Sequence, residues 1–247
     1  MFLGGFFGTE EQWASFDPKW REALGPQRRL LHMHRLRWNS DSTRRLLERL
    51  GSIPNASGLT PVLGGLRFGD YEDLVVGTPD ERLLKGYLAC IAPMVIQILK
   101  VVPDNDCLEL IFEEQPEYQH YANLALQISV LETAKNQPWA ISSDGRPKLA
   151  KWTFVSKGST ARLDPADYFV FALGKLYTDP KSKKAEWCKP ILQSGGGKGI
   201  GSIMHRKMIR TIIMNTQLLA QYRTLVQRLN MEFRVEGRLD DEQHGTT

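Results

Sequence analysis

The sequence predicts an α/β domain in which a sheet with parallel neighbouring strands carries helices on its faces, followed by a long C-terminal helix. Two observations support this class. From residue 60 onward, short apolar segments typical of strands alternate with segments of helical period. The chain also has 247 residues, of which 42% are apolar and 24% charged. It is therefore long enough to bury a sizeable core without disulfides or a structural metal.

The first sixty residues predict two strands, each followed by a helix. Phe2–Phe7 is a short apolar run, and Thr9 can cap a helix that Gly25 ends. Residues 30–36 (LLHMHRL) alternate in part and predict another strand. A helix capped by residues 40–42 is expected to end at Gly51.

The alternating part of the chain contains three further strands and three helices. Apolar density and length indicate strands, whereas apolar residues at spacings of three and four indicate helices. The expected strands are 60–68, 107–112 and 151–155, and the expected helices start at Pro79, Tyr118 and Asp164. Ligands of such sheets gather at the carboxyl ends of the strands.

The composition changes after residue 177, so we expect a domain at 1–177 and an appendage at 178–247. The appendage begins with a basic connector and a flexible glycine hinge, Ser194–Ser202. The hinge matches neither phosphate-loop template. Ile203–Phe233 reads as one long helix that packs on the domain or forms a homodimer with a second copy.

Composition argues against export and against membrane insertion. The three cysteines, Cys90, Cys107 and Cys188, have no paired spacing, which indicates a reducing compartment. The longest apolar stretch, Tyr87–Leu99, is shorter than the roughly 20 residues that a membrane span needs. No charged-then-apolar leader opens the chain, so we expect a cytoplasmic protein with no membrane partner.

Three carboxylates are candidates for a shared site. Glu113 and Glu114 follow the apolar strand 107–112, and Asp167 lies in the first turn of the helix after the last predicted strand. If the two strands are neighbours, these side chains converge, and oxygen ligands of this kind suit Mg²⁺ or Mn²⁺. The alternatives are an acid that stabilises a helix N-terminus and acids that are simply solvated.

Histidines and basic residues suggest contacts with a polyanion. His32 and His34 would share one face of a strand, where they could contact metal or phosphate, or they are polar surface residues. The net charge of +4 tilts weakly toward polyanionic partners. Basic residues gather near the start of the chain and at 198–210, where they either bind nucleic acid or form solvated faces.

Four phrases in order, FLGGFFGTEEQW, LLHMH, LELIFEE and LDPADYFVFALGK, resemble the landmarks of the bacterial domain of unknown function 3800 family over residues 2–176. The resemblance implies a ribonuclease H-like fold with a mixed sheet and acids on its first strand, at the end of its fourth strand and in a late helix. It places Glu113, with Glu114 beside it, at the fourth-strand position and Asp167 in the late helix.

The sequence departs from that family at its first strand. Members typically begin with a strand that ends in Asp-Glu-Ser, whereas this chain begins with what should be the next strand. Either its true start lies upstream of Met1, or a strand and a metal ligand are both lost. Glu113 also stands where aspartate is usual, which moves the carboxylate by one methylene.

The resemblance and the acids together predict a divalent-metal-dependent nuclease. Glu113 and Asp167 would be its catalytic metal ligands, Glu114 a further ligand, Mg²⁺ or Mn²⁺ the cofactor, and His32 and His34 the substrate contacts. The alternative is a catalytically inactive module that binds nucleic acid or protein.

Overall fold

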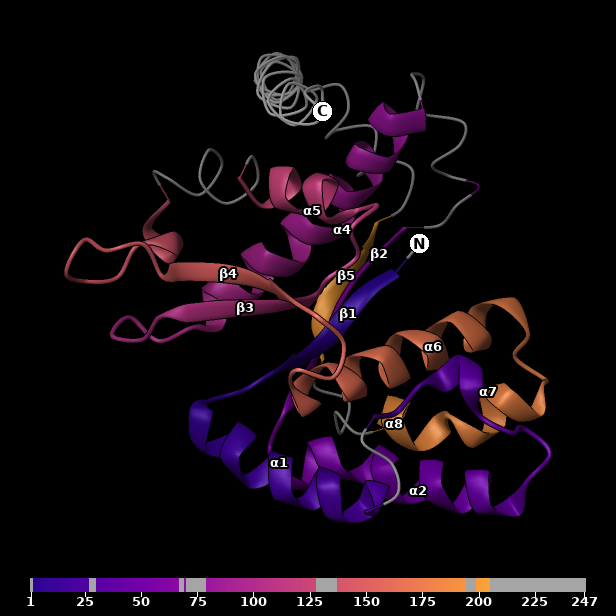
Figure 1. Ribbon diagram of the computed structural model, residues 1–247. Helices are drawn as coiled ribbons and strands as arrows, with labels where there is room; N and C mark the ends of the chain where they lie inside the picture. Colours follow the sequence, from indigo (N-terminus) through magenta and orange to yellow (C-terminus); the bar gives the residue numbers. More distant parts are fainter. Residues whose placement is uncertain are drawn as a thin grey trace, which may run out of the picture.

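The computed structural model describes residues 2–26, 30–66, 69, 79–127, 137–193 and 199–204. Its strands lie between two groups of helices: α4 and α5 cover one side, and α1, α2, α6, α7 and α8 lie on the other (Figure 1). The α/β class predicted from the sequence is confirmed. The ribonuclease H-like arrangement stays a prediction.

The first strand and helix form as the sequence predicts. β1 (Phe2–Phe7) leads into α1 (Glu10–Leu24), where Thr9 and Gln12 make a reciprocal capping box. Gly25 follows the helix at a φ of 83°, a backbone conformation that favours glycine. On the buried face of α1, Trp20 packs against the core that α2 and α6 share.

The first sheet has the order β1-β2-β5. β2 (Thr60–Leu66) pairs antiparallel with β1 and parallel with β5 (Ile200–Met204). The predictions of a hinge through Ser202 and of a helix from Ile203 are therefore wrong at residues 200–204. The small glycine-rich segment adds an edge strand there, where Gly201 lies opposite Leu63. The rest of the expected helix lies outside the described residues.

β3 (Leu108–Glu113) and β4 (Leu149–Val155) form a separate parallel pair in which Glu113 lies opposite Val155. The prediction of one continuous sheet is thus not met among the described strands. A common core joins the two sheets instead, because side chains from both pack against α4 (Pro79–Val101) and α5 (Gln119–Leu126). Residues 128–134 of the helix that the sequence predicts from Tyr118 lie outside the described residues.

The segment 30–36 is not a strand, which corrects the prediction. It contains the short 3-10 helix η1 (Met33–Arg35), preceded by His32 in an extended conformation. The amide N–H groups of Leu31 and Met33 donate to the side chains of Asp164 and Asp167, at 3.0 and 3.5 Å. Two carboxylates of α6 therefore accept the backbone hydrogen bonds that a neighbouring strand would otherwise have accepted.

The second core lies among α1, α2 (Asp41–Ala56) and α6 (Asp164–Thr178), with α7 (Lys183–Trp187) and α8 (Lys189–Gln193). α2 continues past Gly51, contrary to the prediction that it ends there. A Cβ on that glycine would lie 2.5 Å from Cβ of Pro190, so the residue permits close packing of α8. Cys188 and Ile191 are fully buried, so α7 and α8 contribute to this core.

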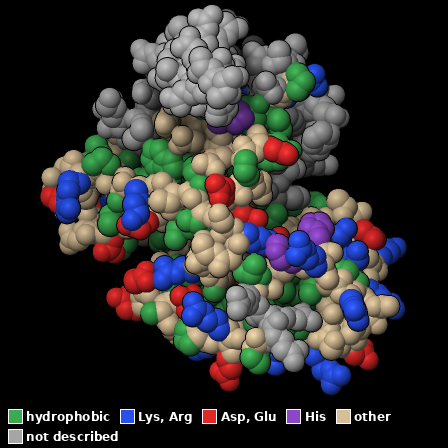
Figure 2. Space-filling view, viewed as in Figure 1, with side chains coloured by type: hydrophobic (Ala, Val, Ile, Leu, Met, Phe, Trp, Pro, Cys, Tyr) green, Lys and Arg blue, Asp and Glu red, His purple; other side chains and the backbone are tan. Residues whose placement is uncertain are grey.

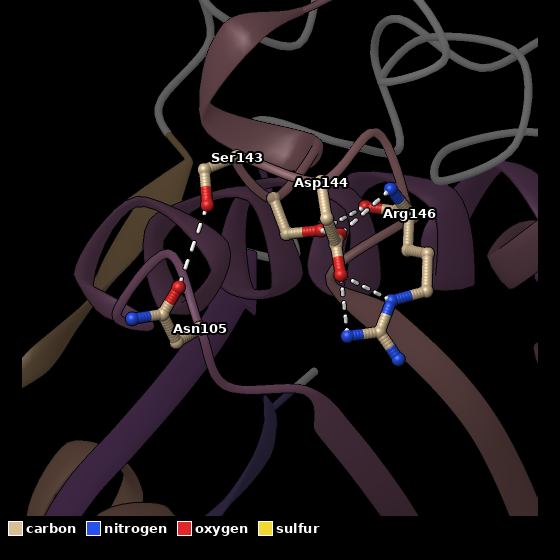
Figure 3. Close-up of polar contacts among 5 residues, drawn as sticks. Asn105, Ser143, Asp144 and Arg146 are labelled. Carbon is tan, nitrogen blue, oxygen red and sulfur yellow. Dashed lines mark hydrogen bonds and ion pairs between the residues drawn. The ribbon is translucent and has the colours of Figure 1, made fainter.

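A tight turn lies between η3 (Pro138–Ala140) and β4 (Figure 3). The hydroxyl of Ser142 donates to the carbonyl of Arg146 at 2.8 Å, and the guanidinium of Arg146 donates to Asp144 at 2.6 Å. The hydroxyl of Ser143 donates to the side-chain carbonyl of Asn105, in the loop between α4 and β3.

None of the helices that the structure describes is both long enough and apolar enough to cross a membrane.

Candidate functional site

Three chain segments meet at one edge of the β3-β4 pair. Because the two strands are parallel and Glu113 lies opposite Val155, both strands end at the same edge. Glu113 is the last residue of β3, Lys157 lies two residues beyond β4, and Asp167 is in the first turn of α6. We call the cluster of Glu113, Lys157 and Asp167 the rim.

The lysine lies between the two acids of the rim. Its Nζ atom is 2.8 Å from Oδ2 of Asp167 and 3.8 Å from Oε2 of Glu113. The three side chains are only 17%, 21% and 30% exposed for Lys157, Asp167 and Glu113. The structure therefore brings Glu113 and Asp167 together, as the sequence predicts, but around an ammonium group that sequence reasoning overlooked.

A second aspartate, one turn earlier in α6, extends the rim inward. Asp164 is 1% exposed, and its Oδ2 accepts hydrogen bonds from the indole of Trp20 at 3.3 Å and from the amide of Leu31 at 3.0 Å. Its Oδ1 is buried without a hydrogen-bond partner. Burial raises the pKa of Asp164 to about 6, because desolvation outweighs the two hydrogen bonds that favour the carboxylate.

The two predicted histidines do not share a face. His32 lies near the rim, where burial lowers its pKa first, and the positive charges of Lys157 and Arg35 lower it further. Both effects favour the neutral imidazole. His34 is exposed and packs edge-to-face on the ring of Phe171, with centroids 5.4 Å apart. The same-face expectation fails because the segment turns into η1 instead of continuing as a strand.

Glu114 does not join the rim contacts. Its Oε2 accepts a hydrogen bond of 2.6 Å from the hydroxyl of Ser156, and the residue is exposed. Glu113, one residue earlier, faces Lys157 instead. Neighbouring residues at the end of an extended strand point to opposite sides, which explains why only one of the two glutamates reaches the rim.

The rim as it stands does not fit a divalent ion. Across the described part of the chain, no group of three or more His, Cys, Asp or Glu side chains could hold a metal. The position between Glu113 and Asp167 is filled by the ammonium of Lys157, and Oδ2 of Asp167 also accepts the Met33 amide. With that ammonium removed, the two carboxylates that converge here would be oxygen ligands of the kind that a hard cation prefers.

A cluster of aromatic rings and cations lies beyond His34. Trp38 stacks on Phe171 at 5.2 Å and on Trp187 at 6.1 Å, all three partly exposed. Nζ of Lys175 lies 5.7 Å from the Phe171 ring, and Nζ of Lys184 lies 5.4 Å from the Trp38 ring. We call these residues, with His34 and Arg35, the basic-aromatic face. Blue and purple side chains gather in front of α6 in the space-filling view (Figure 2).

Sequence reasoning missed this face because its members come from three separate segments. Trp38 follows η1, Phe171 lies in α6, and Trp187 ends α7. The signal that could have found it was a pair of tryptophans in polar, basic stretches, at Trp38 and Trp187. Apolar rings in such surroundings indicate contacts beyond the local helix.

Comparisons with known proteins find no family model, no curated protein and no solved structure that matches this chain. The resemblance to the domain of unknown function 3800 family therefore rests on the four sequence phrases alone.

Proposed function

We propose that this chain binds nucleic acid through its basic-aromatic face and does so without cleaving it. The observation that supports this proposal is the combination of partly exposed rings with cations held against them at Trp38 and Phe171. Proteins that bind single strands combine positive charge, which follows the phosphates, with aromatic rings that contact bases. Here both kinds of side chain occur on one face.

The charges of this face are available to a phosphate backbone. Arg35 and His34 are exposed, and Arg35 follows His34 directly in the last turn of η1. Arginine can make bidentate contacts with phosphate oxygens. Lys175 and Lys184 already lie over aromatic rings, an arrangement worth about 0.5–1 kcal/mol at an exposed site. They are held close to where a base would contact the rings.

The rim supports the binding function by holding the segment that carries part of the face. Asp164 and Asp167 accept hydrogen bonds from the amides of Leu31 and Met33. Met33 directly precedes His34 and Arg35 in the chain. We therefore assign these acids to the positioning of residues 31–35. Metal-dependent phosphodiester hydrolysis at Glu113 and Asp167 stays a prediction of the sequence resemblance, and the test below includes it.

The test is a filter-binding series with labelled single-stranded DNA and RNA over increasing salt. We expect affinity to fall steeply with salt, because phosphate contacts release counterions. Arg35→Gln should weaken binding about three- to tenfold and reduce the salt slope by about 1. The matched control is Arg21→Gln, which removes an exposed arginine from the last turn of α1 and should leave binding unchanged.

Three outcomes would overturn the proposal. Binding that is undetectable at low salt, or equally weakened by both arginine variants, would remove the nucleic-acid function from this face. Incubation of the same substrates with Mn²⁺ forms the second arm of the test. If the wild type cleaves these substrates and Asp167→Asn abolishes the cleavage, the protein is a metal-dependent nuclease and the proposal is wrong.

A further inference from the structure

We propose that Lys157 is a built-in cation that takes the place of a divalent ion at the rim. Its ammonium lies within 4 Å of carboxylate oxygens from two elements far apart in the sequence, β3 and α6. The inference concerns the rim alone and does not depend on nucleic-acid binding. It accounts for why two acids that the resemblance assigns to metal instead face each other across a lysine.

The two acids of the rim lie close enough together for one cation to contact both. Nζ of Lys157 is 2.8 Å from an oxygen of Asp167 and 3.8 Å from an oxygen of Glu113. The ammonium group therefore offsets the charge of both carboxylates. It is a point charge on a flexible stem, and it donates a hydrogen bond to Asp167 and forms an ion pair with Glu113. The Lys157 side chain is only 17% exposed, so water competes weakly for its ammonium group.

Glu113 and Asp167 would repel each other if no cation stood between them, and the buried carboxyl of Asp164 lies close enough that Asp167 and Lys157 both influence its pKa. One ammonium offsets part of this repulsion. Because the lysine is covalently part of the chain, it is present at the rim at every metal concentration. A free ion would have to compete with it for the same oxygens.

Lys157 connects the end of β3 to α6, and Asp167 continues the connection to the Met33 amide. Removal of the ammonium leaves two partly buried carboxylates without their cation. A divalent ion added to that variant can restore the missing charge between the same two oxygens. The structure thus predicts that metal binding appears only when the lysine is removed.

The experiment compares thermal unfolding of the full chain with and without millimolar Mn²⁺. Lys157→Met, which keeps the stem and removes the charge, should lower the midpoint, and Mn²⁺ should raise it again. The wild type should show no Mn²⁺-dependent shift. Lys157→Met combined with Asp167→Asn should lose the rescue. Lys151→Met is the matched control, because Lys151 forms an exposed ion pair with Glu109 across the β3-β4 pair.

Two results would overturn the inference. The first is an Mn²⁺-dependent rise of the wild-type midpoint that Asp167→Asn abolishes, since the rim would then take metal with the lysine in place. The second is a Lys157→Met variant that folds normally and gains no response to Mn²⁺. If Lys157→Met does not fold, Lys157→Arg keeps the positive charge and must behave as the wild type, with no midpoint shift in Mn²⁺. A shift in that variant contradicts the proposal.

Discussion

The rim and the turn between η3 and β4 are both built from carboxylates and cations, yet they differ in what they join. In the turn, Asp144 pairs with Arg146 two residues away, and both side chains are about half exposed or more (Figure 3). In the rim, Lys157 pairs with Glu113, 44 positions earlier in the chain, and with Asp167. Charge pairs of similar chemistry can therefore serve a local turn in one place and connect distant elements in another.

Burial decides how much each pair contributes to stability. An exposed ion pair gains little because water and salt screen it. A partly buried pair leaves its partner poorly solvated when one member is removed. The comparison predicts large effects at the rim and small ones at the turn, and the next experiments test this from the largest expected effect to the smallest.

Replacement of Lys157 should have the largest effect on stability. We expect Lys157→Met to lower the free energy of unfolding by about 2 kcal/mol, because two carboxylates lose a cation in a partly buried setting. Urea unfolding of both proteins measures this. A loss no greater than that of Lys151→Met, whose exposed pair with Glu109 is the surface counterpart, would remove the distinction between the two kinds of pair.

Asp164 should give an effect of similar size on the free energy of unfolding, but one that depends on pH. Its pKa is raised by burial to about 6 in the folded chain, above its ordinary value of 3.8. The folded state therefore holds the proton more tightly than the unfolded state. The resulting contribution to the free energy of unfolding is fully present below about pH 4. It is lost as the pH rises through 6.

Urea titrations at several pH values test this point with Asp164→Asn, which cannot titrate. Relative to the wild type, the variant should gain on the order of 2 kcal/mol between pH 4 and pH 7. A difference between the two proteins that stays constant with pH would mean that the buried carboxyl does not take up a proton on folding in this range.

Asp144 should give the smallest effect. The hydrogen bond from Arg146 lowers its pKa first, and Ser142 lowers it further, but the side chain is about half exposed to solvent. We expect Asp144→Asn to leave the midpoint of thermal unfolding within experimental error. A loss of stability comparable to that of Lys157→Met would show that exposure does not determine how much the ion pairs of the two regions contribute to stability.

Local signals predicted the elements well, and the contacts between remote segments were harder to predict. Thr9 and Gly25 marked the ends of α1 because capping depends on a few adjacent residues. The proximity of Glu113 and Asp167 was also predictable, since parallel strands end at one edge. Lys157 was missed because a lysine two residues after a strand is common on protein surfaces.

Two further errors have physical causes that no local pattern carries. Residues 30–36 alternate like a strand, but the acids of α6 accept their amides. Gly51 resembles a helix end, but it is required for the close approach of Pro190. In both cases a partner more than 100 positions away decided the local structure.

The most direct test of the central claim is X-ray diffraction from wild-type crystals soaked in Mn²⁺, with anomalous scattering recorded at a wavelength where manganese scatters strongly. We predict density for the Lys157 side chain between Glu113 and Asp167 and no anomalous peak there. A manganese peak bonded to both carboxylates, with the lysine displaced, would contradict the account.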